Sequence, residues 1–167
     1  GEIARRQEDT EAARRVYEEA LALARQESLK TQISYITLNL AMVACVQGDY
    51  NSACSFALEG LKICEELGDK AFMGGALGIF AALAVIAKET EKAARLFGAM
   101  QAIHDAIGYK IDKVDQIFFN RYINDARIAL GEAFEAAFEE GRLMKLKEAI
   151  ALAREIRLPE TDTKYDV

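Results

Sequence analysis

The sequence is poor in proline, and this scarcity narrows the fold classes open to it. Its 167 residues include one Pro, at position 159, and no Trp. A sandwich or barrel of short strands needs frequent turn clusters, which are rare here, so these all-β folds are excluded. Ala, Glu and Leu instead occur 29, 18 and 16 times. All three are strong helix formers, so the composition predicts an all-α protein.

Histidine and cysteine are also scarce, which limits the chemistry that the chain could perform. There is one His, and the three Cys are Cys45, Cys54 and Cys64, all in apolar stretches. An odd number of thiols without a disulfide-like framework is typical of the reduced cytosol, so we expect a cytoplasmic protein. The first twenty residues are charged and amphipathic, and this pattern does not fit a signal peptide.

The chain has an excess of acidic residues, with 27 Asp and Glu against 21 Lys and Arg and a formal net charge of −6. This balance argues against direct binding of nucleic acid by this segment. Hydrophobic residues make up 51% of the chain, which is enough to fill a core and excludes wholesale disorder.

One stretch of seventeen residues, 71–87, carries no charge and invites comparison with a membrane span. It contains three Gly, is short for a spanning helix, and is bracketed by charged residues on both sides. We therefore predict a helix buried between its neighbours and apolar all round, and no membrane contact.

The strongest pattern is an internal repeat of forty residues, seen when segments 8–21, 48–61 and 88–101 are aligned without gaps. Three columns recur at this period: Ala13, Ala53 and Ala93; Tyr17, Ala57 and Phe97; and Leu23, Ile63 and Ile103. Ser28, Gly68 and Gly108 close the units. Small residues in one column allow two helices to approach closely, so the repeat predicts stacked helix pairs.

Each unit is expected to hold two antiparallel helices, which gives a tetratricopeptide-like right-handed superhelix of about eight helices. The expected helices are 4–26, 31–47, 51–67, 70–87, 90–107, 112–130, 131–141 and 147–157. The single domain 1–167 then divides into a half repeat (1–28), two repeats (29–68 and 69–108), divergent capping helices (109–158) and a polar tail (159–167). Gly48 and Asp49 are expected to form a turn, Gly68 a left-handed cap, and Asp69 an N-cap. The missing first helix predicts a piece of a longer protein.

Segment 39–61, NLAMVACVQGDYNSACSFALEGL, resembles a tetratricopeptide repeat. The matching features are Asn-Leu-Ala in the first helix, Gly-Asp-Tyr at the turn, and small residues spaced along the second helix. A forty-residue period departs from the usual thirty-four or so, which implies helices about one turn longer.

Residues 85–155 are similar to the C-terminal end of bacterial signalling ATPases, the LuxR-type or antibiotic-regulator-type transcription factors. The similarity is carried by KAARLFGAMQAIHDAIGYKI and by ALGEAFEAAFEEGRLMKLKEAIALA. It implies a non-catalytic module for protein interaction or effector sensing within a regulator. The alternative is a free-standing scaffold or adaptor protein. No Gly-rich phosphate loop or helix-turn-helix reader is present in the sequence, so ATPase or DNA-binding activity would belong to other domains.

No residue combination in the sequence predicts catalysis, a metal site or a cofactor. His104 falls in the helical column of Ala24 and Cys64 and has no partners at metal-ligand or catalytic spacing. The paired glutamates lie near helix ends or outer faces, where solvated charge is the ordinary interpretation. We therefore expect no enzyme activity.

The remaining candidate site is the concave face that the first helices of successive units would line. Its expected residues are Tyr35, Leu38, Asn39, Met42, Gly75, Gly78, Ala82, Phe118, Arg121 and Tyr122. Such a wall suits a protein, a peptide or a small apolar effector. The competing interpretation is that these residues pack against another helix of the chain or a second copy. If Gly78 is packed rather than open, the site would move to the helices around Phe134 and Phe138.

The first helix is expected to lack a partner on the face that carries Ile3, Val16, Ala20 and Leu23. A solenoid end without a polar cap exposes apolar area. This predicts that the fragment forms a symmetric homodimer through its N-terminal helix.

Overall fold

The computed structural model describes residues 2–159, and the side chains from position 9 onward, as eight α-helices without strands in that range. The helices are α1 Glu2–Gln26, α2 Lys30–Gln47, α3 Tyr50–Leu67, α4 Lys70–Ile86, α5 Thr90–Ile107, α6 Lys113–Leu130, α7 Ala133–Leu143 and α8 Leu146–Arg154. The all-α prediction is confirmed. The expected tail 160–167 and the side chain of Ile3 lie outside the described residues.

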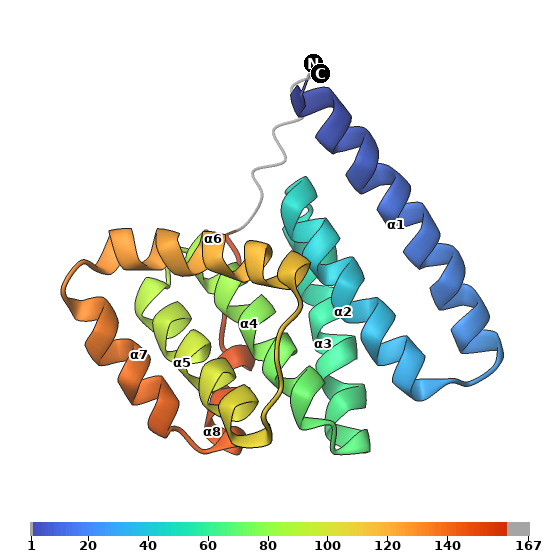
Figure 1. Ribbon diagram of the computed structural model, residues 1–167. Helices are drawn as coiled ribbons and strands as arrows, with labels where there is room; N and C mark the ends of the chain where they lie inside the picture. The colour runs from blue at the N-terminus through green and yellow to red at the C-terminus, as the bar shows by residue number, and fades with distance from the viewer. Residues whose placement is uncertain (1, 160–167) are drawn as a thin grey trace.

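The first five helices form a stack in which each helix packs against the next one along the chain (Figure 1). Helix α2 also packs directly on α4, the corresponding helix of the next pair. Ala53 and Ala93, the small-residue column of the repeat, are both fully buried. Ala13 in the same column is only partly buried, because α1 stands at the end of the stack.

The turns between helices repeat with the sequence. Ser28, Gly68 and Gly108, forty residues apart, have φ values of 56°, 69° and 66°, so all three adopt the left-handed conformation. Gly68 is the C-cap of α3, and the carboxylate of Asp69 accepts a hydrogen bond from the backbone N–H of Phe72 at 3.1 Å. Both caps expected from the sequence are therefore confirmed, and they separate one unit from the next.

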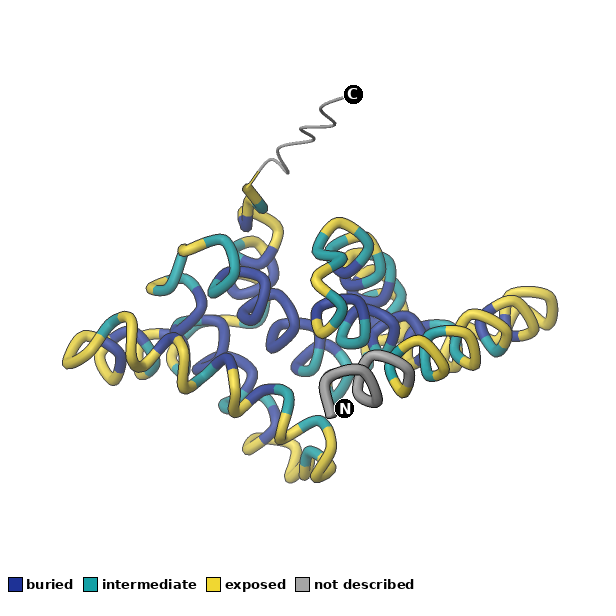
Figure 2. The backbone as a smooth tube through the Cα atoms, turned by 90° about the horizontal axis from the view of Figure 1, so that it is seen from above, coloured by how far each residue is buried: buried dark blue, intermediate teal, exposed yellow. Residues whose placement is uncertain are grey.

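Helix α4 lies at the centre of the molecule and accounts for the uncharged stretch. Eleven of its seventeen residues are buried, on all sides of the helix (Figure 2). Leu77, Phe80 and Leu83 belong to the main core, together with residues of α2, α3, α5 and α8. Among the described helices, none has the length and apolar character needed to cross a membrane.

The C-terminal helices depart from the repeat. Helix α6 crosses over α4 and α5 instead of extending the stack, α7 packs along α5, and α8 packs on α4 and α5 (Figure 1). Gly131 ends α6 with a φ of 57°, so α7 begins at Ala133, two residues later than expected. Helix α8 ends at Arg154, short of the expected residue 157. These three helices close one end of the molecule.

Helices α5 and α7 are in unusually close contact through two glycines. A Cβ placed on Gly98 would lie 2.0 Å from the carbonyl oxygen of Phe138, and one on Gly141 would lie 1.9 Å from that of Arg95. The sequence blocks AARLFGA of α5 and GEAFEAAFEEGR at α7 therefore pack on one another. Their small residues serve helix docking in this structure.

The N-terminal helix α1 packs mainly on α2, through Leu21 and Ala24. Val16 and Leu23 point away from the core, with exposed fractions of 64% and 65%. Ala20 belongs instead with the residues that pack against α2. The apolar face expected for homodimerisation is thus reduced to Val16 and Leu23 among the described side chains.

Candidate functional site

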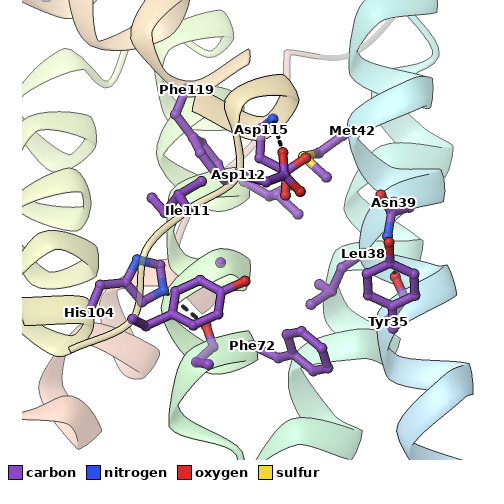
Figure 3. Close-up of a pocket in the computed structure, with 14 residues that line it drawn as sticks. Tyr35, Leu38, Asn39, Met42, Phe72, His104, Ile111, Asp112, Asp115 and Phe119 are labelled. Atoms are coloured by element: carbon purple, nitrogen blue, oxygen red, sulfur yellow. Dashed lines mark hydrogen bonds between the residues drawn. The ribbon is translucent and has the colours of Figure 1, made fainter. Parts of the chain in front are cut away.

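An open cleft lies between α2, α4, the end of α5 and the start of α6 (Figure 3). Its empty space is about 500 Å³, part of which is continuous with solvent. The lining residues are Tyr35, Leu38, Asn39, Met42, Ala71, Phe72, Gly75, Ile79, His104, Tyr109, Ile111, Asp112, Asp115 and Phe119. We call this space the α2–α6 cleft. The part of the cleft that water-sized molecules can occupy is smaller, about 60 Å³.

Helical periodicity brings the apolar wall together. Tyr35, Leu38 and Met42 recur at spacings of three and four, so they share one face of α2. Phe72 and Ile79 are separated by seven residues on α4 and face them. The rings of Tyr35 and Phe72 lie 5.8 Å apart, centroid to centroid, and join the two helices at one end of the cleft.

Gly75 leaves open space in the wall of the cleft because it has no side chain. A Cβ placed on it would meet no atom within 4 Å, so α4 presents bare backbone to the cleft. Gly78 lies on another face: a Cβ there would be 2.5 Å from Met100 Sδ and 2.6 Å from Phe119 Cε1. Gly78 and Ala82 are both buried and neither lines the cleft. The sequence therefore misplaced these two residues, because α5 and α6 cover their side of α4.

The two glycines are expected to respond in opposite directions to alanine. Gly75→Ala gains helix propensity without a clash and should raise the free energy of unfolding by up to about 1 kcal/mol. Gly78→Ala overpacks the contact with Met100 and Phe119 and should lower it by about 1–3 kcal/mol. Urea denaturation of both variants measures the difference. Equal shifts would contradict the assignment of Gly75 to the open wall.

The start of α6 forms the acidic end of the cleft. Asp112 is the N-cap of this helix, and its Oδ1 accepts hydrogen bonds from the backbone N–H groups of Val114 and Asp115, both at 2.9 Å. The Asp115 carboxylate lies beside it (Figure 3). Burial, with a smaller contribution from the Asp112 charge, raises the pKa of Asp115 to about 6. None of the fourteen lining residues is Lys or Arg.

Asp115→Asn is therefore expected to stabilise the protein in a pH-dependent way. The pKa of Asp115 is higher in the folded chain than the ordinary aspartate value of 3.8, so ionisation of its carboxyl fully penalises the folded state above about pH 6. Below about pH 4 the carboxyl is protonated in both states. The variant should melt at a higher temperature than wild type at pH 8, and the gap should shrink as the pH falls from 6 to 4. A gap of constant size across this range would contradict the shift.

His104 forms part of the cleft wall from α5, and the structure makes it a buried residue with an exposed fraction of 2%. Its Nε2 lies 3.0 Å from the carbonyl oxygen of Ala71, to which it can only donate (Figure 3). Nδ1 is then an acceptor, and it is buried without a partner among the described residues. Burial lowers the pKa of His104, so the ring is neutral and adds no positive charge to the cleft.

Nine of the ten predicted groove residues divide into three groups, and Phe118 belongs to none of them. Tyr35, Leu38, Asn39, Met42 and Gly75 line the α2–α6 cleft. Arg121 and Tyr122 line a separate and wider cleft that also contains Cys45, Tyr50 and Lys88. Phe118 is partly buried, with its ring 5.3 Å from that of Phe119. Gly78 and Ala82 form the third, fully packed group.

Asn39 makes contacts within the chain that leave it poorly suited to clamp a peptide. Its Nδ2 donates to the carbonyl oxygen of Tyr35 at 2.8 Å, and its Oδ1 accepts from the hydroxyl of Tyr17 at 3.3 Å. The second of these bonds ties α1 to α2. Asn39 thus stabilises the packing of α1 on α2, and its side chain also lines the cleft.

Several residues of the cleft were missed in the sequence. Asp112 carries a recognisable N-cap signal, because it directly precedes an amphipathic helix. Phe72, Tyr109, Ile111, Asp115 and Phe119 have no local signal that separates them from ordinary core residues. Phe134 and Phe138, the fallback site, pack against each other at 5.7 Å, and Phe134 is buried in the junction of α5, α6 and α7.

Comparison with protein-family models, with curated protein sequences and with solved structures gives no match to this chain. The side chains described from position 9 onward include no group of three or more His, Cys, Asp or Glu that could hold a metal ion. The three cysteines are unpaired, and burial raises the pKa of Cys45 and Cys64 to about 12. Such thiols are poor nucleophiles, so the α2–α6 cleft remains the candidate site.

Proposed function

We propose that this chain is a non-catalytic, effector-sensing helical-repeat module of a bacterial transcriptional regulator or signalling ATPase, and that the α2–α6 cleft binds the effector. The observation that carries the proposal is the cleft itself. It combines an apolar wall, a helix that exposes bare backbone at Gly75, and a few polar groups at one end. This combination is typical of small-molecule sites.

The placement of the cleft supports a sensing role. Helices α2 and α6 both pack on α4, but they are not among the packed helix pairs of the described chain. A ligand in the cleft would contact both, since Leu38 and Met42 come from α2 and Asp115 and Phe119 from α6. Binding would then favour one relative position of the repeat and the C-terminal helices, which is the requirement for a ligand-driven population shift.

The context within a larger regulator rests on residues 85–155 and their order of motifs, which are similar to the ends of LuxR-type regulators. We also propose a cytoplasmic location, supported by three unpaired thiols. The alternative function is a scaffold that binds proteins. It is favoured by exposed apolar side chains along the outer face of α6, where Val114, Ile117 and Ile128 are largely uncovered.

The proposal can be tested with 4-phenylbutanol, a small neutral probe with an apolar body. We expect backbone amide shifts in the NMR spectrum of the ¹⁵N-labelled protein at millimolar probe, centred on residues of α2, α4 and the first turn of α6. Slower amide hydrogen exchange is expected in both α2 and α6.

The matched variant is Gly75→Leu, whose side chain would occupy the open part of the wall without meeting a neighbour at Cβ. It should fold like wild type and lose the probe-induced shifts. Absence of shifts in wild type, or shifts that persist in Gly75→Leu, would refute the α2–α6 cleft as the binding site.

A further inference from the structure

We propose that the effector of the α2–α6 cleft is a small organic cation, an apolar molecule that carries a protonated amine. The ammonium group would lie at Asp115, and the apolar body would lie along Leu38, Phe72 and Ile79. This inference rests on the proposed function, and it adds the chemical class of the ligand.

The α2–α6 cleft carries negative charge without a compensating positive group. Asp112 and Asp115 are two carboxylates, and neither Lys nor Arg lines the space. Asp112 uses one oxygen to cap α6. The Asp115 carboxylate, in contrast, accepts no hydrogen bond and forms no ion pair within the described part of the chain, although it is only partly exposed. A carboxylate withdrawn from water without a counter-charge is costly, and a bound cation would remove that cost.

His104, in the same wall, supplies no counter-charge. Its ring is almost completely buried, and its Nε2 donates to the carbonyl oxygen of Ala71. The neutral ring cannot balance the charge of Asp115, so the cleft leaves that carboxylate for a bound ammonium group to pair with.

Aromatic rings supply the remaining surface. Tyr35, Phe72, Tyr109 and Phe119 all line the cleft, and the Tyr109 ring lies 4.8 Å from that of His104. Phe72 and Tyr35 lie at the end opposite Asp115 (Figure 3). Aromatic faces attract cations and apolar groups alike, so the cleft accepts a molecule with a charged end and an apolar end. An anionic ligand would meet both carboxylates and is disfavoured.

The test uses three probes of one shape: 4-phenylbutylamine, 4-phenylbutanol and 4-phenylbutyrate. By titration at pH 7.5, wild type should bind the amine about tenfold or more tightly than the alcohol, as expected for a charge-assisted hydrogen bond. The carboxylate should bind least. Asp115→Asn should remove the preference for the amine, so that the variant binds the amine and the alcohol with similar affinity.

Asp125→Asn is the matched control. Asp125 lies ten residues along the same helix and lines the other cleft, so its loss changes the net charge equally. It should keep the preference for the amine. If Asp125→Asn loses the preference as Asp115→Asn does, the effect is general attraction to an acidic protein, and the proposal is wrong.

The pH dependence gives a second readout. Other titratable groups in the cleft are Asp112 from the same helix, His104 from α5, Tyr35 from α2 and Tyr109 between α5 and α6. The preference for the amine should fall as the pH drops through about 6, where Asp115 gains a proton, and the affinity for the alcohol should not change.

The two proposals fail in different ways. If wild type bound the amine and the alcohol equally, and Gly75→Leu bound neither, the proposed preference for a cation would be wrong. The assignment of the α2–α6 cleft as the binding site would stand. No binding of any probe by wild type would overturn the cleft as an effector site and the cation with it.

Discussion

Gly141→Ala is expected to lower the free energy of unfolding by about 3 kcal/mol or more, which is at the upper end for overpacking. A Cβ at this position would lie 1.9 Å from the backbone carbonyl oxygen of Arg95. Backbone atoms cannot rotate away as a side chain can, so α7 would have to move off α5. Gly98→Ala should behave similarly, because its Cβ would meet the carbonyl oxygen of Phe138 at 2.0 Å.

Urea denaturation followed by far-ultraviolet circular dichroism measures this effect. Gly75→Ala is the matched control, since it makes the same change in the middle of a helix where nothing lies within 4 Å. It should stabilise the protein. If Gly141→Ala and Gly75→Ala gave midpoints that agree, the close contact of α5 and α7 would be disproved.

Phe134→Ala is expected to lower the free energy of unfolding by about 3–5 kcal/mol, the range for removing a buried aromatic side chain. Phe134 is 1% exposed and packs with Ala94, Ala126 and Ala137 at the junction of α5, α6 and α7. Its ring stacks on Phe138, and the guanidinium carbon of Arg127 lies 4.6 Å from its centroid. Its buried neighbours Ala94, Ala126 and Ala137 are too small to refill the space.

The control for this prediction is Ile128→Ala on α6, where the side chain is 80% exposed and the effect should stay within about 0.5 kcal/mol. Because α6 also carries Asp115 and Phe119, loosening its junction should weaken probe binding in the α2–α6 cleft. A Phe134→Ala protein that keeps wild-type stability would show that the C-terminal helices do not fold as one unit with the repeat.

The sequence was sufficient to predict local features. The forty-residue period places the ends of the units at Ser28, Gly68 and Gly108, and the left-handed cap expected at Gly68 is found at all three positions. The 3.6-residue periodicity of α2 likewise places Tyr35, Leu38 and Met42 on one face, and all three line the cleft. These features depend on residues close together in the chain, where spacing alone determines direction.

The features that the sequence did not predict depend on contacts between residues far apart in the chain. The sequence placed Phe118 on the concave face, but α6 crosses α4 and α5, and Phe119 faces the cleft instead. One residue changes the direction of a helical side chain by about 100°, so a small error in the orientation of α6 exchanges these two rings. That orientation is set where Phe119 meets Gly78 and Met100, which are 41 and 19 residues away in the sequence. Only the tertiary structure therefore brings Asp115 to the acidic end of the cleft, because its position follows from how α6 packs.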